Sequence, residues 1–388
     1  MRAVVYRGVN DLRLETVPVP RLDRNELLVK VAVCGVCPTD IKKIQHGTVP
    51  PPRIFGHETA GTIVRIGGGR STLVTPLSSL KIGDRVALHH HVPCLDCHFC
   101  RHHAFAQCET YKRTGITAGF EPAGGGYAEY VRVMPFVLPG VVKIPAKNSF
   151  AEGAMLEPVN TVLKAVRRLN LLSGDTVLVA GQGPIGLMFT RLLQLAGARV
   201  LATDLLESRL KLAKKFGARW TRLVSSSKFK VQGLKAQVAD RKQTTLNFEH
   251  QTLDCAVIAV PSDDAVHQAL QLVRGGGQVL LFAHTKRGRA ELPLRRDARQ
   301  RVPTDVRTPR RSVPTTLDFS SICLDEKDLI GSYSSDFTLQ AEVARLVFSR
   351  RLDVRPLISH YFPLEQTAEA IALAAQPTAN SLKVLVRG

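Results

Sequence analysis

A glycine motif between an apolar run and an amphipathic segment is the feature that most constrains the fold. Residues 176–195 are typical of a strand, a G-x-G-x-x-G turn and a helix, in that order. The first glycine permits the tight turn, the second lets a pyrophosphate approach the backbone, and the third lets the helix pack on the strand, while the helix N-terminus faces the phosphates. The motif alone is weak evidence, but this context favours a dinucleotide site. The residues expected to bind the cofactor are Gly181, Gly183, Pro184, Ile185 and Gly186.

The strand expected at 199–203 leads directly into a carboxylate. Asp204 follows Gly181 by 23 residues, where a carboxylate accepts hydrogen bonds from the ribose hydroxyls of adenosine and repels a 2′-phosphate. NAD is therefore favoured over NADP. Arg209, one helical turn further on, is placed to contact that ribose or a phosphate, which keeps some use of NADP open.

Two patterns divide the chain. Strand and helix signals alternate from about residue 160, which predicts a parallel sheet covered by helices. Residues up to about 147 are instead short β segments separated by Gly, Pro and Asp, which are typical of an all-β, barrel-like domain. The later elements are expected as strands at 255–260, 278–282, 327–333, 358–364 and 383–387, and as helices at 339–349 and 365–375. The sequence therefore predicts an α/β protein with a barrel-like N-terminal part followed by a helix-covered parallel sheet.

The formal charge of +20 is concentrated in two segments. Residues 204–242 contribute +8 and residues 286–311 contribute +7. Residues 225–250 and 286–316 fit neither pattern, and prolines exclude a helix from the second, so a long surface loop is expected there. A solvated, arginine-rich surface is our preferred interpretation. The alternative is a binding surface for nucleic acid or an acidic partner, but residues 286–316 contain no aromatic side chain to stack on bases, so no nucleic-acid partner is expected.

Composition limits the class of protein further. The chain has 388 residues, 44% of them apolar and 22% charged, as in ordinary globular proteins. No stretch approaches the roughly 20 uninterrupted apolar residues of a membrane span. The N-terminus lacks an apolar signal core and a small-residue cleavage site. We therefore expect a cytoplasmic protein without a membrane partner.

Four of the eight cysteines fall within fifteen residues. Four thiolates at this spacing can surround one tetrahedral zinc ion and leave no open position, so the predicted site is structural. An iron–sulfur cluster is the chemical rival, but the longer third gap and the absence of a Cys-Pro pair after the last cysteine argue against it. The predicted ligands are Cys94, Cys97, Cys100 and Cys108.

A third set of residues is dispersed. Cys37, His57 and Glu157 stand in Cys-Pro-Thr-Asp, Gly-His-Glu and Glu-Pro-Val-Asn contexts. Sequence spacing alone does not join them, and each has an ordinary explanation as a buried thiol, a strand-end histidine or a carboxylate at a helix N-terminus.

Taken together and in this order, the cysteine cluster, Gly56-His57-Glu58, the glycine motif and Asp204 resemble the zinc-dependent medium-chain alcohol dehydrogenases. The resemblance covers nearly the whole chain except 225–250 and 286–316. Glu157-Pro158 is similar to the polyol (sorbitol) and threonine dehydrogenase branch. The resemblance implies a GroES-like, barrel-like catalytic domain in 1–159, resumed by 334–388, and a doubly wound Rossmann domain that binds NAD in 160–333. It also implies two zinc ions per chain, one catalytic and one structural.

The resemblance also assigns roles. It implies that Cys37 and His57 bind the catalytic zinc together with Glu58 or Glu157, and both carboxylates stay open as the third ligand. Thr39 would take the substrate proton, and Asp40 would orient the zinc-bound imidazole.

One position departs from the family pattern. Many relatives have a histidine five residues after the zinc cysteine, where this chain has Lys42. A lysine carries protons only if its pKa is depressed, and otherwise bulk water takes over.

The expected reaction is hydride transfer from a secondary alcohol or polyol to NAD, giving a ketone, with the zinc as a Lewis acid. An L-threonine 3-dehydrogenase and an aldose (sugar) dehydrogenase are the alternatives, because Glu157 does not separate the three. The resemblance further implies a homotetramer or homodimer.

Overall fold

A computed structural model describes residues 1–68, 79–89, 92–110, 124–224, 253–283 and 319–388. The segments 225–250 and 286–316, interpreted above as polar insertions, lie outside these residues. Within the described ranges, no helix is both long enough and apolar enough to cross a membrane.

Six parallel strands form one sheet, with the order β11-β10-β9-β12-β13-β14. Every strand predicted for the dinucleotide domain is present, with ends that differ by a few residues. The structure adds β11, an edge strand that the sequence analysis did not predict. The strands are β9 (Thr176–Ala180), β10 (Arg199–Asp204), β11 (Trp220–Leu223), β12 (Leu253–Ile258), β13 (Val273–Leu281) and β14 (Asp328–Gly331).

Helices cover both faces of this sheet. One face packs its strands against α5, α6 and α7 in a single apolar cluster, and the opposite face packs against α8 in another. Two-sided burial explains why the central strands are continuously apolar. The sheet is therefore doubly wound, as predicted. Its helices are α5 (Leu156–Val166), α6 (Pro184–Leu195), α7 (Glu207–Lys215), α8 (Asp263–Leu272) and α9 (Phe319–Leu324).

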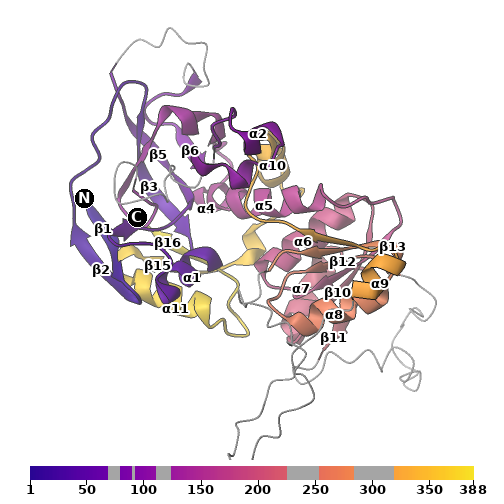
Figure 1. Cartoon of the computed structure of the whole chain (residues 1–388). Coiled ribbons are helices and arrows are strands. Elements are labelled where there is room, and N and C mark those ends of the chain that lie inside the picture. Colours follow the sequence, from indigo (N-terminus) through magenta and orange to yellow (C-terminus); the bar gives the residue numbers. More distant parts are fainter. Residues whose placement is uncertain (69–78, 90–91, 111–123, 225–252, 284–318) are drawn as a thin grey trace, which may run out of the picture.

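The N-terminal and C-terminal parts share the second large sheet, with the order β15-β16-β3-β5-β6-β8 and with β7 paired to β3. Strand β16, the last element of the chain, pairs antiparallel with β3, so the C-terminal strand lies beside N-terminal ones (Figure 1). A smaller sheet, β2-β1-β4, lies beside it. These strands are β1 (Arg2–Gly8), β2 (Asp11–Thr16), β3 (Leu27–Gly35), β4 (Arg53–Ile54), β5 (Glu58–Ile66), β6 (Arg85–Leu88), β7 (Tyr130–Val133), β8 (Val141–Lys143), β15 (Ile358–Pro363) and β16 (Lys383–Arg387).

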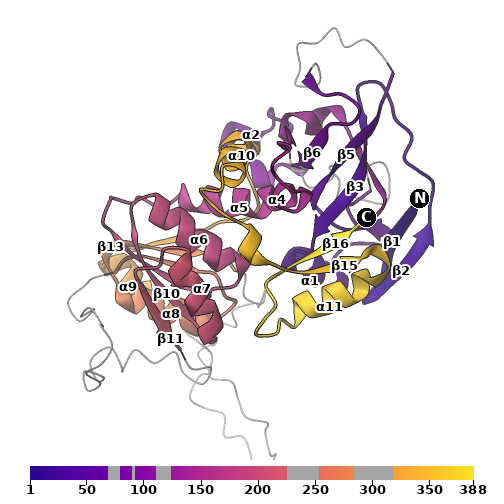
Figure 2. The same cartoon turned by 180° about the vertical axis from the view of Figure 1, so that it is seen from behind.

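The part expected to be all-β also contains helices, and this is where the structure differs most from the sequence analysis. Helix α1 directly follows β3, and a short α2 belongs to the cysteine segment. Seen from behind, α4, α5 and α10 lie between the two large sheets (Figure 2). The predicted boundary between residues 159 and 160 falls inside α5, and the division into domains stays a prediction. The helices outside the parallel sheet are α1 (Pro38–His46), α2 (His98–Arg101), α4 (Phe150–Ala154), α10 (Gln340–Phe348) and α11 (Thr367–Ala375).

Candidate active site and metal centres

Three residues far apart in sequence converge where β3 ends and β5 begins. Gly35 at the end of β3 pairs with Glu58 at the start of β5, so Cys37 and His57 lie beside this pair. Suitable ligand atoms of Cys37, His57 and Glu58 all lie within 4.8 Å of one another. A Cβ at Gly35 would stand 1.8 Å from a Glu58 oxygen, so this close approach requires glycine. A thiolate, an imidazole and a carboxylate are a donor set that suits zinc.

The carboxylate of Asp40 contacts the imidazole ring of His57. Asp40 in the first turn of α1 lies with its Oδ2 atom 3.1 Å from Nδ1 of His57. Burial alone would lower the pKa of His57, but the charges of Asp40 and Cys37 outweigh it and raise that pKa well above its ordinary value. An aspartate on Nδ1 leaves Nε2 of the ring for a metal, which is the usual arrangement of a zinc-bound histidine.

Glu157 lies in the first turn of α5 and is 6% exposed. It stands outside the group of mutually close ligand atoms, but the charges of His57 and Glu58 act on it. Burial is the main reason that the pKa of Glu157 rises to about 7, and Glu58 adds to the rise while His57 opposes it. The geometry thus groups Glu58 with Cys37 and His57, and keeps Glu157 as a buried carboxylate nearby.

The structure adds a residue that the sequence analysis missed. Lys383, the first residue of β16, is buried and forms an ion pair with Glu58. Its Nζ also donates to the backbone oxygen of Val36, at 2.9 Å. A lysine directly before the apolar Val-Leu-Val run of β16 was the available signal, and nothing local pointed to a partner 325 residues away.

Thr39 and Lys42, the predicted proton carriers, both lie on α1. The hydroxyl of Thr39 is 3.1 Å from Sγ of Cys37, so it directly adjoins the metal-binding group. Lys42 follows Thr39 by three residues, which places the two on one face of the helix. Burial lowers the pKa of Lys42, in the direction that proton transfer requires.

The four predicted structural ligands are gathered in one lobe, which we call the cysteine lobe (residues 94–108). A zinc–sulfur distance of about 2.3 Å in a tetrahedron implies sulfurs about 3.8 Å apart. The Sγ separations are 3.9 Å for Cys94–Cys100, 3.5 Å for Cys97–Cys100 and 3.7 Å for Cys94–Cys108. Backbone N–H groups lower the pKa of the Cys94 thiol to about 6. The lobe therefore fits a closed four-sulfur zinc site.

The glycine motif forms the turn between β9 and α6. Gly181 has φ 90°, and a Cβ there would lie 2.2 Å from a side chain that follows β12. A Cβ at Gly186 would stand 1.7 Å from the Gly181 oxygen, whereas Gly183 has no heavy atom within 4 Å of that position. Pro184 and Ile185 open α6. The open space at Gly183 in front of a helix N-terminus fits the pyrophosphate of a dinucleotide.

Asp204 ends β10 beside this turn. Its Oδ2 accepts a hydrogen bond of 2.6 Å from the N–H of Gln182, and its Oδ1 accepts one of 2.9 Å from the N–H of Leu206. Arg209 approaches the same carboxylate, with 3.9 Å between Nη1 and Oδ2. Both predicted ribose-reading residues thus lie next to the glycine turn.

A cavity of about 1140 Å³ lies elsewhere, between the cysteine lobe, the end of α5, α8 and β14. His103, Lys164, Asp263 and Tyr333 are among its lining residues, and none of the predicted metal or cofactor residues is. Its size does not make it the reaction site, because the donor groups and the glycine turn lie outside it.

Comparisons with known proteins identify the family. The family model described as an alcohol dehydrogenase GroES-like domain matches residues 23–146, and the model described as a zinc-binding dehydrogenase matches residues 184–305. Sorbitol dehydrogenase of Bombyx mori is 28% identical over 393 residues, which cover 99% of this chain and 97% of the relative. A probable D-xylulose reductase A of Emericella nidulans is 27% identical over 396 residues, covering 99% of this chain and 95% of the relative.

Solved structures show the same fold. The 2R,3R-butanediol dehydrogenase of Bacillus subtilis superposes with a TM-score of 0.75 at 22% identity, covering 100% of this chain and 99% of that one. A zinc-binding dehydrogenase of Sinorhizobium meliloti bound to NADP gives a TM-score of 0.77 at 24% identity, with coverage of 100% and 99%. The predicted fold class, a GroES-like domain with a Rossmann domain, is confirmed. The cofactors of the protein are zinc and NAD(P). The chain belongs to the zinc-dependent medium-chain alcohol dehydrogenases, in the sorbitol dehydrogenase-like branch.

Proposed function

We propose that the protein oxidises a secondary hydroxyl of a polyol to a ketone, with NAD as the hydride acceptor. The observation that carries this proposal is the convergence of half-buried Cys37 with buried His57 and Glu58, with Glu157 close by. The names of the relatives, sorbitol dehydrogenase and probable D-xylulose reductase, support polyols over simple alcohols. In the reaction the alcohol carbon loses a hydride and the hydroxyl loses a proton, so a ketone, NADH and H⁺ are formed.

When bound, the zinc supplies Lewis acidity toward the alcohol oxygen and the nicotinamide takes up the hydride. The residues of the chain prepare the site for this chemistry. Asp40 holds the ring of His57 in one orientation, 3.1 Å away. Lys383 fixes the position of the Glu58 carboxylate through their ion pair. Pairing of buried charges in this way limits the motion of the donor groups.

The proton leaves along α1 in this proposal. The Thr39 hydroxyl lies 3.1 Å from the Cys37 sulfur, within reach of a group bound at the metal position. It receives the substrate proton, and Lys42 on the same helix face passes the proton to water. The lowered pKa of Lys42 supports this role.

We infer a preference for NAD from the surroundings of Asp204. Its carboxylate is fixed by two backbone N–H groups, so a 2′-phosphate would meet a negative charge that cannot move away. Arg209 offers a compensating positive charge 3.9 Å from that carboxylate. We expect NADP to be used at a lower rate, not excluded.

The test is reduction of NAD and NADP by zinc-loaded protein with a panel of polyols, simple alcohols, L-threonine and aldoses. We expect the highest kcat/KM with a polyol and NAD, and loss of that rate with a chelator. Cys37→Ser should abolish turnover, whereas Cys323→Ser, on the exposed α9, is the matched control. A higher kcat/KM with L-threonine or an aldose would replace the polyol assignment, and a chelator-insensitive rate would remove zinc from the reaction.

Assembly and location stay predictions. We propose a homotetramer or homodimer in the cytoplasm, and the measurement for assembly is the mass of the purified protein in solution. The predicted basic surface is not part of the proposed function. Of its two segments, only residues 204–224 belong to the described part of the chain.

A further inference from the structure

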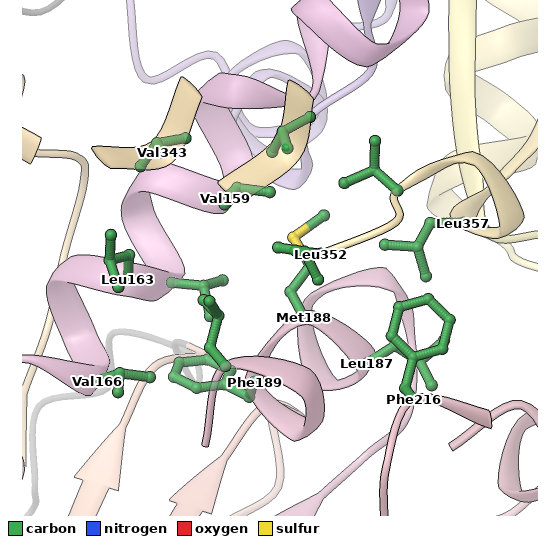
Figure 3. Packing of buried hydrophobic residues seen from close by; sticks show 14 of the residues in the cluster. Val159, Leu163, Val166, Leu187, Met188, Phe189, Phe216, Val343, Leu352 and Leu357 are labelled. Atoms are coloured by element: carbon green, nitrogen blue, oxygen red, sulfur yellow. The ribbon is translucent and has the colours of Figure 1, made fainter. Parts of the chain in front are cut away.

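A pair of buried amides interrupts an otherwise apolar interface between α5 and α10. Val159 and Leu163 of α5 pack with Val343 of α10 in one apolar cluster (Figure 3). At the N-terminal end of α10, Nδ2 of Asn160 donates to Oε1 of Gln340 at 3.0 Å. The two side chains are 0% and 3% exposed. Burial of amides in an apolar interface is costly unless they are fully paired, so such a pair fixes one register of the two helices.

Asn160 also contacts the segment that precedes α10. Its Oδ1 accepts a hydrogen bond of 2.8 Å from the backbone N–H of Asp336, and the carboxylate of Asp336 in turn binds the N–H of Thr338 at 2.9 Å. The side chain of Asn160 is therefore hydrogen-bonded to both ends of residues 336–340, a segment that we call the clasp.

The clasp reaches the cysteine lobe through an aromatic side chain. The rings of Phe337 and Phe105 meet edge to face, with their centres 5.4 Å apart. Phe337 packs on the small apolar core of the lobe, which includes Cys100 and Cys108. The clasp thus contacts the cysteine lobe through Phe337, and Asn160 through both of its ends.

Asn160 lies one helical turn after Glu157 on α5, so the two share a helix face. We propose that Asn160 is a positioning residue for Glu157, and that the clasp couples the cysteine lobe to the catalytic metal site through it. This inference rests on the proposed function, because it takes Glu157 to act at that site. A rigid helix held at this point keeps the carboxylate at one distance from the metal ligands. Loss of a group that orients a metal ligand typically lowers metal affinity by about 10- to 100-fold.

A matched control lies just before α4, at the other end of α10. Asn148 is also buried, at 2% exposure, and its Nδ2 donates to Glu152 at 2.9 Å and to the backbone oxygen of Phe348 at 3.3 Å. It fastens the other end of α10 but has no contact with the clasp in the described structure. Asn148→Ala should therefore lower the unfolding midpoint without a change at the metal site.

The test measures zinc affinity by competition with a chelator, together with kcat, KM and thermal unfolding. We expect Asn160→Ala to lower the affinity of the catalytic site for zinc by about tenfold or more and to lower kcat, with an unchanged KM for NAD. Phe337→Ala removes the contact between the clasp and the cysteine lobe, so it should also lower the zinc affinity of the catalytic site and kcat. Asn148→Ala should reduce only the unfolding midpoint.

A double-mutant cycle separates positioning from general stability. If Asn160 acts through Glu157, Asn160→Ala should cause no further loss of zinc affinity or kcat in a Glu157→Gln background. Additive losses would overturn the inference, as would wild-type zinc affinity in Asn160→Ala. If Asn160→Ala does not fold, Gln340→Met removes the same hydrogen bond from the other helix and should give the same result.

The zinc measurements need no turnover, so they remain valid if no polyol is a substrate. In that case the proposed function is wrong, and zinc affinity alone tests the positioning role of Asn160. If Glu157→Gln leaves zinc affinity and kcat unchanged, nothing remains for Asn160 to position and the inference is wrong.

Discussion

Lys383 shows how much a single buried charge decides at this site. Its ammonium group pairs with Glu58 where both side chains are almost fully buried. Removal of one partner from a buried pair leaves an uncompensated charge, which typically costs about 3–5 kcal/mol. The pair therefore stabilises the position of Glu58 only as long as both members are present.

We predict that Lys383→Met lowers the free energy of unfolding by about 3 kcal/mol or more and weakens zinc binding at the catalytic site. Urea denaturation and zinc titration are the measurements. Lys143→Met is the control, because the pair of Lys143 with Asp84 is more exposed and should contribute about 1 kcal/mol or less. Addition of Glu58→Gln to Lys383→Met should recover part of the stability, and a failure to do so would mean that Lys383 acts through packing.

The raised pKa of Glu157 predicts a pH dependence of the metal-free protein. Burial raises this pKa from 4.5 to about 7, so the folded protein holds the proton more tightly than the unfolded chain. The stabilisation is complete below pH 4.5 and is lost as the pH rises through 7, with about 3 kcal/mol as the upper limit. In urea denaturation of metal-free protein, Glu157→Gln should flatten this slope between pH 5 and 8. An unchanged slope would mean that Glu157 is ionised throughout.

At the scale of the elements, the cysteine lobe depends on its metal. It contains only the short α2 and a single 3₁₀ turn, and its apolar core is small. A lobe with so little apolar burial requires a metal to hold one conformation.

Cys94→Ser should therefore reduce the zinc content from two ions per chain to one and lower the thermal unfolding midpoint by about 5 °C or more. Metal analysis and calorimetry test this. Cys323→Ser should change neither quantity. Retention of both zinc ions in Cys94→Ser would remove Cys94 from the ligand set.

The structure also shows where prediction of elements from the sequence succeeds. The strands and helices around the glycine turn were predicted closely, because their apolar spacing and terminating glycines are local signals. Helix α1 was missed although its signals were present. Pro38 opens it, Ile41 and Ile44 give helical spacing, and Gly47 ends it with φ 61°. Strand β11 was missed because it is a four-residue edge strand with few apolar positions.

At the scale of the whole molecule, one apolar cluster joins the two large sheets. It includes Val33 and Ala87 from one sheet and Val177 and Leu280 from the other. Figure 3 shows side chains of α5 and α6 packed together in this cluster, with Val343 of α10 beside them. We expect this shared burial to make the two sheets unfold together.

We predict that Leu163→Ala, at a site 5% exposed in this cluster, lowers the free energy of unfolding by about 2–5 kcal/mol. The fluorescence of Trp220, the single tryptophan, reports on the parallel sheet, and far-ultraviolet circular dichroism reports on the whole chain. Both signals should shift together. The control is Leu172→Ala, at 74% exposure, with an expected change within about 0.5 kcal/mol. Separate transitions would mean that the sheets unfold independently.

The sequence alone indicated those features whose signals are local. Cysteine spacing predicted the structural zinc site, and a glycine turn between a strand and a helix predicted the dinucleotide site, because ligands and backbone geometry lie within a few residues in each case. The family resemblance supplied the rest of the catalytic set, since Cys37, His57 and Glu157 have no local spacing that joins them.

The tertiary structure decided how these parts meet. Pairing of β3 with β5 brings Glu58 to Cys37, the last strand carries Lys383 to Glu58, and Asn160 meets Gln340 across 180 residues. Such contacts depend on strand register and helix packing, which the whole core fixes at once. A buried charge or amide gains its role only from the partner that folding places beside it, and no local pattern records that partner.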